Sequence, residues 1–519
     1  MMLFLAAAVW TVDLLPATLS TGETQQKKPL PATMPGGVAV LDFDGDGKLD
    51  LFFEGGEARN KLLRNLGGMK FADVTVKAGL AGSGYSMGAV AADYDGDGWV
   101  DLLVCGLRAV TVYRNRGDGT FAVATTAAGV NNHERWSVGA AWVDWDRDGD
   151  LDLFILNYLK WDPAKEQVCL VNGKPDFCHP KNYEPEANAL FRNNGDGTFT
   201  DISEESGIAA HKGKGMGVAV VDGDGDGWPD LFVTNDRMFA FYFRNVEGKR
   251  FEECALARGV AVPQDGNPVS GMGVDGQDYD NDGKADLVYT ALRDETFPLY
   301  RNVGGDFEEA TSRSKMGVLT RAMSGWGVVF ADLDNDGWKD MAAARSDALS
   351  ATGGKGAGAK EPPSWFRNRG RAGGAAGAGG AAGAGGAAGA GGAVTFELGT
   401  GWEAMPKAMY RGLAAADLDG DGCLDVVVTA LGEQARVMRN PCQGVGHWLQ
   451  VRAARGAVRV RVDGQWREAS TTAGYASSNA GPLHFGVGAK TEVEAEVIWF
   501  DGKSTVVKTA VDRVLQVSR

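Results

Sequence analysis

The 519-residue sequence lacks several features that would assign it to common protein classes. Beyond its N-terminal region it has no apolar run of 18 or more residues, which argues against a transmembrane helix. It has five histidines, and none is paired with another at a metal-ligand spacing. The net charge of −16 argues against a nucleic-acid partner. An apolar content of 44% and a charged content of 23% are typical of a globular protein.

The N-terminal region resembles a secretory signal. An apolar run from Leu3 to Trp10 precedes small residues around Ala17 to Thr21, although no Lys or Arg stands before the run and Asp13 lies between the two parts. A start assigned at the wrong Met is the alternative. We expect residues 1–33 to be a signal-like or flexible segment, and the protein to be secreted, periplasmic or on the outer cell surface.

Cysteine is scarce, at six residues, but its positions are informative. Cys169 and Cys178 bracket a short polar loop and could form a local disulfide. A second disulfide could join two further cysteines, Cys423 and Cys442. The remaining two, Cys105 and Cys254, lie in strand-like segments and are more simply buried thiols. Disulfides suit an extracellular or periplasmic compartment.

A nine-residue acidic loop occurs seven times in the chain. The first copy, Asp42–Asp50, reads D-F-D-G-D-G-K-L-D, and every copy has Asp at positions 1, 3, 5 and 9 and Gly at position 6. We number these copies loops 1 to 7. Carboxylates this close repel one another and resist burial, whereas a hard cation such as calcium takes six to eight oxygen ligands. The loops supply 28 of the 68 acidic residues and therefore much of the negative charge.

We therefore predict up to seven calcium sites, in which the four Asp side chains and the backbone carbonyl at position 7 are ligands. The predicted ligands are Asp42, Asp44, Asp46, Lys48 and Asp50 in loop 1; Asp93, Asp95, Asp97, Trp99 and Asp101 in loop 2; Asp144, Asp146, Asp148, Asp150 and Asp152 in loop 3; Asp222, Asp224, Asp226, Trp228 and Asp230 in loop 4; Asp278, Asp280, Asp282, Lys284 and Asp286 in loop 5; Asp332, Asp334, Asp336, Trp338 and Asp340 in loop 6; and Asp417, Asp419, Asp421, Cys423 and Asp425 in loop 7. The Trp rings at position 7 are expected to cover the loops or to pack between neighbouring repeats.

An EF-hand shares the D-x-D-x-D-G opening but needs a bidentate Glu at position 12 and a helix on each side. Here position 12 is apolar or aromatic in most copies, as at Phe53 and Val104, and the flanking segments are typical of strands. The pattern therefore excludes an EF-hand.

The repeat is larger than the loop. A Gly stands five residues before each loop, apolar strands flank the loop, and an Arg-Asn pair such as Arg64-Asn65 ends a third strand. Gly-Asp-Gly turns such as Gly117–Gly119 then lead to a fourth strand. Seven units of four strands predict an all-β fold, a seven-bladed β-propeller over residues 34–444, with an open β-solenoid as the runner-up.

Two blades carry insertions between their second and third strands. The longer one runs from about Asn157 to Glu186, and the other covers about residues 346–363. A low-complexity Gly/Ala loop, 370–393, comes next within the sixth blade. The insertions are expected on the face opposite the acidic loops, and we expect that face to carry recognition, since long loops on a rigid scaffold commonly do.

The D-x-D-x-D-G-x-x-D loops and the Arg-Asn turns resemble FG-GAP/VCBS repeats, which are related to those of integrin α-subunits. The last segment, 445–519, resembles the ASPIC/UnbV module, a small β-rich domain. The residues that carry this second resemblance are His447-Trp448-Leu449, Gly474-Tyr475, Ser477-Ser478, His484–Gly488 and Trp499–Gly502. Together the two parts resemble the cartilage acidic protein family and its bacterial relatives.

This sequence departs from the family pattern in two places. The stretch between Trp448 and Gly474 is short, and no aromatic-led strand is evident before Leu30, where the family usually has one that could close the ring. Closure is therefore expected either from Trp448–Arg452 or from the N-terminal segment. The resemblance implies a secreted calcium-binding protein with interaction or adhesion roles and no established enzymatic activity.

Catalytic motifs are weak. Gly84–Gly88 matches the hydrolase pattern G-x-S-x-G, but the same place in other repeats leads into a strand, and no helix pattern comes after it. We predict a non-enzymatic, exported, calcium-binding propeller that binds an extracellular protein or glycan. A calcium-dependent polysaccharide hydrolase or lyase on a propeller scaffold is the alternative, and a lectin with one site per blade is a third possibility.

Overall fold

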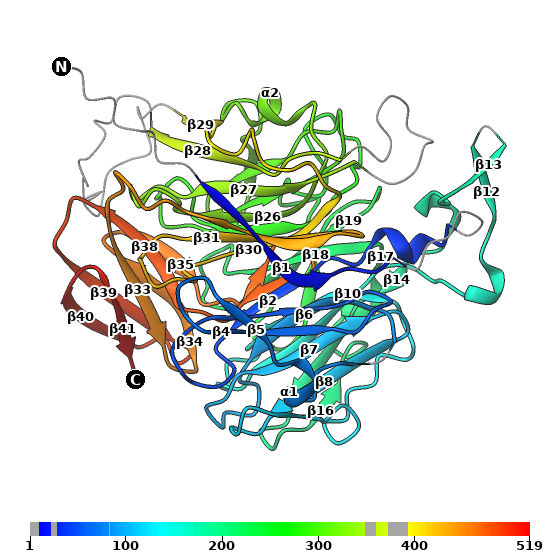
Figure 1. Ribbon diagram of the computed structural model, residues 1–519, viewed down its shortest axis with the longest axis horizontal. Coiled ribbons are helices and arrows are strands. Elements are labelled where there is room, and N and C mark those ends of the chain that lie inside the picture. Colours follow the sequence, from blue (N-terminus) through cyan, green and yellow to red (C-terminus); the bar gives the residue numbers. More distant parts are fainter. Residues whose placement is uncertain (1–9, 22–27, 83, 172, 348–359, 372–392) are drawn as a thin grey trace.

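The computed structural model describes residues 10–21, 28–82, 84–171, 173–347, 360–371 and 393–519 (Figure 1). Its strands form seven repeat sheets, six of four strands and one in which two more strands join the four of the first repeat, together with two short two-stranded sheets and a C-terminal domain of two sheets. The described residues contain two short α-helices, α1 (Thr75–Ala78) and α2 (Met316–Thr320). None of these residues forms a helix that is long and apolar enough to cross a membrane. The prediction of an all-β propeller is confirmed.

The second sheet illustrates the repeat. Its strands are β6 (Ser86–Ala92), β7 (Asp101–Gly106), β8 (Ala109–Asn115) and β9 (Phe121–Val123), and consecutive strands pair antiparallel. All seven residues of β6 are buried. A strand with both faces covered has no solvent side, which explains its nearly continuous run of small and apolar residues.

The other six sheets repeat this order. The first sheet contains β2 (Val38–Leu41), β3 (Asp50–Phe53), β4 (Lys61–Asn65) and β5 (Phe71–Asp73). The third contains β10 (Ser137–Val143), β11 (Asp152–Asn157), β15 (Ala189–Asn193) and β16 (Phe199–Asp201), and the fourth β18 (Gly215–Val221), β19 (Asp230–Asn235), β20 (Phe241–Asn245) and β21 (Phe251–Glu253). The fifth contains β22 (Val274–Gln277), β23 (Asp286–Tyr289), β24 (Leu299–Asn302) and β25 (Phe307–Glu309). The sixth contains β26 (Gly325–Ala331), β27 (Asp340–Arg345), β28 (Ser364–Arg371) and β29 (Val394–Leu398), and the seventh β30 (Tyr410–Ala416), β31 (Asp425–Ala430), β32 (Gln434–Arg439) and the N-terminal β1 (Thr11–Thr18).

The first strands of the sheets surround a common centre. Each contacts the first strand of the next sheet, and β30 of the seventh contacts β2 of the first. The Asn of every Arg-Asn pair joins neighbouring sheets, because its side-chain amide donates to the backbone carbonyl at position 2 of the preceding acidic loop. These bonds, each 2.7–3.0 Å long, are Asn65 to Leu418, Asn115 to Phe43, Asn193 to Tyr94, Asn245 to Trp145, Asn302 to Gly223, Asn368 to Tyr279 and Asn440 to Leu333.

We expect Asn193→Ala to destabilise the protein by about 1–3 kcal/mol, because it leaves two buried carbonyls, those of Tyr94 and Leu151, without their donor. Asn194→Ala is the matched control, since this neighbouring side chain is exposed and bonds only to nearby Thr hydroxyls. It should change stability by less than about 0.5 kcal/mol. Urea unfolding monitored by tryptophan fluorescence measures both, and equal losses in the two variants would contradict the inter-sheet role.

The N-terminal segment corrects the prediction for residues 1–33. Strand β1 pairs antiparallel with β32, from Thr11 opposite Arg439 to Thr18 opposite Gln434, and supplies the outer strand of the seventh sheet. Leu15 is buried in the adjoining core, and the Trp10 ring packs edge-on against Trp402 at 5.3 Å. The N-terminal segment therefore closes the ring. Trp10, directly before the strand, is an aromatic residue that the sequence interpretation overlooked.

The physical reason is the open edge that β32 would otherwise present, a row of unpaired backbone groups that a distant segment can satisfy. Asp13 and Pro16 hide the strand pattern, although both are tolerated on an outer strand. Cleavage around Ala17 to Thr21 would remove β1. Most of the apolar run of the predicted signal, residues 1–9, lies outside the described residues. The 3-10 turn η1 (Leu30–Thr33) is buried as well, which disagrees with the prediction of a flexible segment there.

The C-terminal segment, for which a small β-rich domain was predicted over residues 445–519, forms two sheets packed around one core. One sheet contains β33 (His447–Ala453), β38 (Leu483–Gly488) and β41 (Arg513–Val517), and the other β34 (Ala457–Val462), β35 (Gln465–Glu468), β39 (Glu492–Trp499) and β40 (Ser504–Ala510). Leu449, Phe485, Val497 and Trp499 are among its buried residues. Trp448–Arg452, one of the two segments expected to close the ring, belongs to β33 of this domain instead.

A segment of the C-terminal domain fills the centre of the ring. We call residues 470–480 the plug; it contains β36 (Thr472–Ala473) and β37 (Ser477–Asn479), and β37 pairs in parallel with β2. The Tyr475 side chain is fully buried, and its hydroxyl donates to the Met34 carbonyl at 2.7 Å. Close packing at the centre accounts for the Gly before the loops, against the plug at Gly37, Gly88, Gly273 and Gly412 and against a neighbouring first strand at Gly217 and Gly327. A Cβ at Gly37 would lie 1.8 Å from the Ala476 carbonyl oxygen, and one at Gly273 would lie 2.7 Å from the Tyr475 nitrogen.

The third-sheet insertion joins β11 to β15, as predicted. It contains η2 (Pro163–Lys165), the hairpin of β12 (Cys169–Val171) and β13 (Lys174–Asp176), η3 (Pro180–Asn182) and β14 (Glu186–Ala187), which pairs with β17 (Lys212–Gly213) after η4 (Ile208–Ala210). Figure 1 shows the hairpin projecting from the side of the molecule opposite the C-terminal domain. The predicted insertion at 346–363 and the Gly/Ala loop at 370–393 fall largely outside the described residues.

Candidate metal centre

Each acidic loop connects the first and second strands of its sheet, and all seven have the same path. The Gly at position 6 has a φ between +84° and +94° in every copy, a conformation that favours Gly. Its N–H donates to one carboxylate oxygen, Oδ2, of the Asp at position 1, as from Gly47 to Asp42 at 3.0 Å. The equivalent bonds in loops 2 to 7 join Gly98 to Asp93, Gly149 to Asp144, Gly227 to Asp222, Gly283 to Asp278, Gly337 to Asp332 and Gly422 to Asp417.

The Asp at position 9 is held by the backbone. In loop 1 the Asp50 Oδ1 atom accepts from the Asn65 N–H at 2.7 Å, and its Oδ2 atom accepts from the Phe43 N–H at 3.2 Å. The same pair of bonds recurs at Asp101, Asp152, Asp230, Asp286, Asp340 and Asp425. This carboxylate therefore has a fixed orientation before any ligand binds.

The Arg of the Arg-Asn pair faces the outer side of its own loop. In loop 1 the Arg64 guanidinium lies 2.5 Å from Asp44 at position 3 and 3.2 Å from Asp46 at position 5. The equivalent ion pairs join Arg114 to Asp95 and Asp97, Arg244 to Asp224 and Asp226, Arg301 to Asp280 and Asp282, Arg367 to Asp334 and Asp336, and Arg439 to Asp419. Further cations reach some loops, such as Arg258 at Asp224 and Arg371 at Asp280, but each loop still has at least four carboxylates.

Carboxylate oxygens from several positions meet on the inner side of the loops. One oxygen each from Asp42, Asp44 and Asp50 lies within 4.8 Å of the others, and loops 2 and 3 bring together the same three positions. At positions 1 and 3 several carboxylate oxygens are buried and accept no hydrogen bond, namely Oδ1 of Asp42, Asp44, Asp144, Asp146, Asp222, Asp224 and Asp334. Calcium binds carboxylate oxygens at about 2.3–2.6 Å, so oxygens at this separation fit a calcium ion.

The raised pKa values of the loop carboxylates also favour a bound cation. Burial, the largest cause, raises the pKa of Asp50 to about 7 and that of Asp152 to about 9, and the neighbouring loop carboxylates raise both further. Crowded, buried carboxylates disfavour their charged form unless a cation is present. The structure therefore brings together three of the four Asp residues predicted for each of loops 1 to 4, those at positions 1, 3 and 9 in loops 1 to 3 and at positions 1, 3 and 5 in loop 4. This arrangement suits a hard divalent cation.

The backbone carbonyl at position 7 remains a predicted ligand. Its N–H donates to the position 5 carboxylate, as from Lys48 to Asp46 at 2.9 Å, and the role assigned to its carbonyl rests on the sequence pattern. The Trp side chains at this position pack between repeats, as expected. The Trp228 ring of loop 4, for example, lies 5.0 Å from the guanidinium carbon of Arg147 in loop 3.

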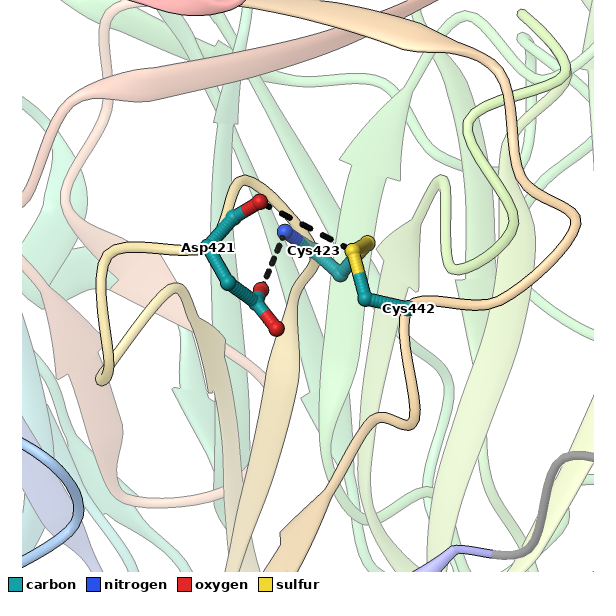
Figure 2. Close-up of side chains that lie close together, drawn as sticks. All are labelled: Asp421, Cys423 and Cys442. Carbon is teal, nitrogen blue, oxygen red and sulfur yellow. Dashed lines mark hydrogen bonds between the residues drawn. A yellow bond between two sulfur atoms is a disulfide. The ribbon is translucent and has the colours of Figure 1, made fainter.

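Loop 7 carries a covalent link. Figure 2 shows Asp421 accepting the Cys423 N–H, at 3.0 Å, beside the disulfide from Cys423 to Cys442. The two sulfurs are bonded to each other, so this cluster is not a thiolate metal site. The other expected disulfide, Cys169–Cys178, is also present. Cys105 is a buried thiol as predicted, and Cys254 is a half-buried one.

The sequence analysis did not predict that the C-terminal domain contacts the acidic loops. The C-terminal domain lies on the loop face and contacts the loop backbones: the Arg455 side chain donates to the Gly149 carbonyl at 3.1 Å, and the Arg459 side chain donates to the Gly283 carbonyl at 3.1 Å. The His484 Nε2 atom lies 2.7 Å from the Asn335 Oδ1 atom of loop 6. The motifs that suggested the ASPIC/UnbV module were the available signal, because His484 belongs to one of them.

The hydrolase-like motif does not form a catalytic site. Ser86 begins β6, is 8% exposed, and its hydroxyl donates to Asn60 and accepts the Gly55 N–H. A nucleophilic Ser needs a base within hydrogen-bond reach, and an Asn side chain is not one. Ser86 is therefore a structural residue of the first and second sheets.

Comparisons with known proteins agree with these features. The FG-GAP-like repeat matches residues 42–104, 93–155, 172–252 and 278–343, the FG-GAP repeat matches residues 409–437, and the ASPIC and UnbV family matches residues 443–519. Cartilage acidic protein 1 of Mus musculus is 23% identical over 520 residues, covering 91% of this chain and 71% of the mouse protein, and the Homo sapiens protein is also 23% identical, covering 91% and 70%. A solved structure of an Agrocybe aegerita lectin that recognises non-reducing terminal N-acetylglucosamine is 19% identical, covers 65% of this chain and 78% of that one, and has a TM-score of 0.40.

Proposed function

Since this chain belongs to the FG-GAP-like repeat family, whose repeats match just over half of it, we propose that it is an exported calcium-binding propeller that acts as a non-enzymatic interaction module. It is related to cartilage acidic protein 1 along most of its length. The single observation that carries the calcium assignment is the set of buried, unpartnered carboxylate oxygens at positions 1 and 3 of the loops.

The residues that would hold calcium are the four Asp side chains and the position 7 carbonyl of each loop. Bound calcium would supply positive charge between carboxylates that otherwise repel one another. This is a structural role. The position 1 Asp begins each loop at the end of the first strand, and the position 9 Asp stands at the start of the second strand, so each site links two strands of one sheet.

Recognition is assigned to the side that carries the third-sheet insertion. The C-terminal domain lies over part of the loop face, and the centre is filled by the plug. The hairpin stands away from the body of the molecule, and two apolar side chains beside and on it, Val168 and Leu170, are 78% and 60% exposed. Exposed apolar groups on a rigid, disulfide-closed hairpin are suited to contact a protein or glycan partner. The two disulfides support an oxidising compartment.

The experiment replaces residues 167–178 with a Gly-Ser linker, which removes both cysteines and keeps the buried packing of Trp161 and Tyr183. The parent chain and the variant are applied in millimolar calcium to a glycan array and to a panel of purified extracellular matrix proteins. We expect the parent chain to bind at least one probe and the variant to lose at least about tenfold in affinity, because the exposed apolar contacts are gone.

Two controls accompany this test. A double variant, Val168→Ser with Leu170→Ser, keeps the hairpin and should lose most of the same binding. It should unfold at the temperature of the parent chain, whereas the linker variant also loses the buried Phe177 and Cys178 and should unfold at a lower one. Binding that survives replacement of the hairpin would move recognition to another surface. Release of soluble sugar from any arrayed polysaccharide would instead favour the hydrolase or lyase alternative.

A further inference from the structure

The contact between loop 6 and the C-terminal domain has a direct bearing on metal occupancy. Two backbone N–H groups of the domain donate to loop carbonyls, from Gly488 to Asn335 at 3.0 Å and from Gly446 to Asp334 at 3.3 Å. His484 adds the side-chain bond to Asn335, and both residues are buried. None of these three contacts is a charge pair. They depend on the path of the loop backbone between positions 3 and 4.

Position 4 of loop 6 has a left-handed backbone, as it does in the other six loops. Asn335 stands at position 4 with a φ of +54°, in the left-handed region, and its side-chain amide donates to the Gly422 carbonyl of loop 7. The domain approaches so closely that a Cβ at Gly486 would lie 2.1 Å from the Asp332 Oδ2 atom and 2.5 Å from the Asn335 Cα atom. Loop 6 must therefore hold one conformation for the domain to lie against it.

Loop 4 lacks such contacts. Its carboxylates pair with Arg244, Arg258 and Tyr242, and in the part of the chain that the structure describes no residue of the C-terminal domain hydrogen-bonds to it or forms an ion pair with it. The sequences are otherwise alike, since Asp226-Gly227-Trp228 in loop 4 corresponds to Asp336-Gly337-Trp338 in loop 6. In both, the position 5 carboxylate accepts the Trp N–H at 2.9 Å and faces the Arg of its own Arg-Asn pair.

From these contacts we infer that a divalent cation held in loop 6 controls the docking of the C-terminal domain and the insertion of its plug into the ring. The inference rests on the proposed calcium sites and adds a regulatory consequence to them. The loop carboxylates repel one another without a cation, so the backbone between positions 3 and 4 loses its single conformation and the three contacts with the domain weaken.

Charge alone would act in the opposite direction. An empty loop face is more negative, and arginines of the C-terminal domain such as Arg455 and Arg459 would be attracted to it more strongly. However, each of these two side chains also donates to a backbone carbonyl, of Gly149 and of Gly283. Because these contacts too depend on the backbone path, loss of loop order outweighs the added attraction.

The test compares Asp336→Ala with its matched control, Asp226→Ala, in the full chain with millimolar calcium. Bound metal is counted by elemental analysis, and amide hydrogen exchange is measured over the plug and over β7 as an internal reference. We expect both variants to lose one ion. Exchange in the plug should become roughly tenfold faster in Asp336→Ala and stay unchanged in Asp226→Ala, with β7 protected in both.

A third variant, His484→Ala, separates docking from metal binding. It should expose the plug to exchange while every loop keeps its ion, because the lost bond ends on the Asn335 side chain, which is not a predicted calcium ligand. If Asp336→Ala loses its ion and the plug stays protected, the inference is overturned although the metal assignment stands. If the parent chain binds no stoichiometric calcium, the proposed function itself fails, and the inference fails with it.

Discussion

Removing calcium with EDTA is expected to lower the midpoint of thermal unfolding by more than about 10 °C. A ligand that binds only the folded state stabilises it by about 2.7 kcal/mol when present at a hundred times its dissociation constant. Seven such sites need not add fully to exceed the effect of any single side chain. In the absence of a cation, burial raises the pKa of both Asp101 and Asp425 to about 8, which reflects the unfavourable placement of their charge.

The measurement is differential scanning calorimetry of the purified chain in EDTA and then with millimolar calcium, with bound metal counted by elemental analysis. Close to seven ions per chain and full recovery of the midpoint are the expected results. The variant Asp73→Asn is a suitable control, because this exposed Asp pairs with Lys61 outside the loops and should leave the calcium response unchanged. An unchanged midpoint without stoichiometric metal would contradict the proposed calcium sites.

Replacing Tyr475 with Ala should destabilise the protein by about 3–5 kcal/mol, the usual cost of deleting a large buried aromatic side chain. Tyr475 is fully buried at the centre of the ring, packs edge-on against Trp326 at 5.3 Å, and donates to the Met34 carbonyl. The plug is anchored there between the N-terminal segment and the sixth sheet. Its loss leaves a cavity that the surrounding first strands cannot fill.

Tyr475→Phe isolates the hydroxyl from the ring. It keeps the aromatic packing and leaves the Met34 carbonyl without a donor, so the expected loss is about 1–2 kcal/mol. Urea unfolding of both variants gives the two values, and the calcium count should remain that of the parent chain because the loops lie outside this contact. Losses of equal size in the two variants would show that the ring contributes little, and the central role of the plug would be wrong.

The acidic loops and the Arg-Asn pairs could be interpreted from sequence because their chemistry is local. Asp42 to Asp50 fold back on one another within nine residues, and Gly47 occupies the turn that its φ requires. The order of strands within each sheet could be inferred from the same repeat, and the two disulfides from the short spacing of their cysteines in the chain. The role of Asn65 could not, because its partner Leu418 is 353 residues away.

The N-terminal strand and the plug could not be predicted from local sequence patterns, because both depend on distant segments of the chain. Strand β1 carries Asp13 and Pro16 and has a weak pattern of its own; it is a strand because β32 presents an open edge. Tyr475 belongs to a motif that could be noticed, but its burial depends on seven first strands that leave a space of the right size. Gly37 and its equivalents could be recognised as a repeat, but the close contacts that require them, with the plug or with a neighbouring first strand, appear only in the tertiary structure.

By itself, the sequence determined the repeat, the propeller class and the clusters of carboxylates that suit calcium, since each depends on residues close together in the chain. The tertiary structure decided how the ring closes, what fills its centre and which face stays open. Those outcomes depend on contacts between segments hundreds of residues apart, such as Arg455 with Gly149 and Tyr475 with Met34. Such contacts form only after the sheets have assembled, and no local pattern encodes their geometry.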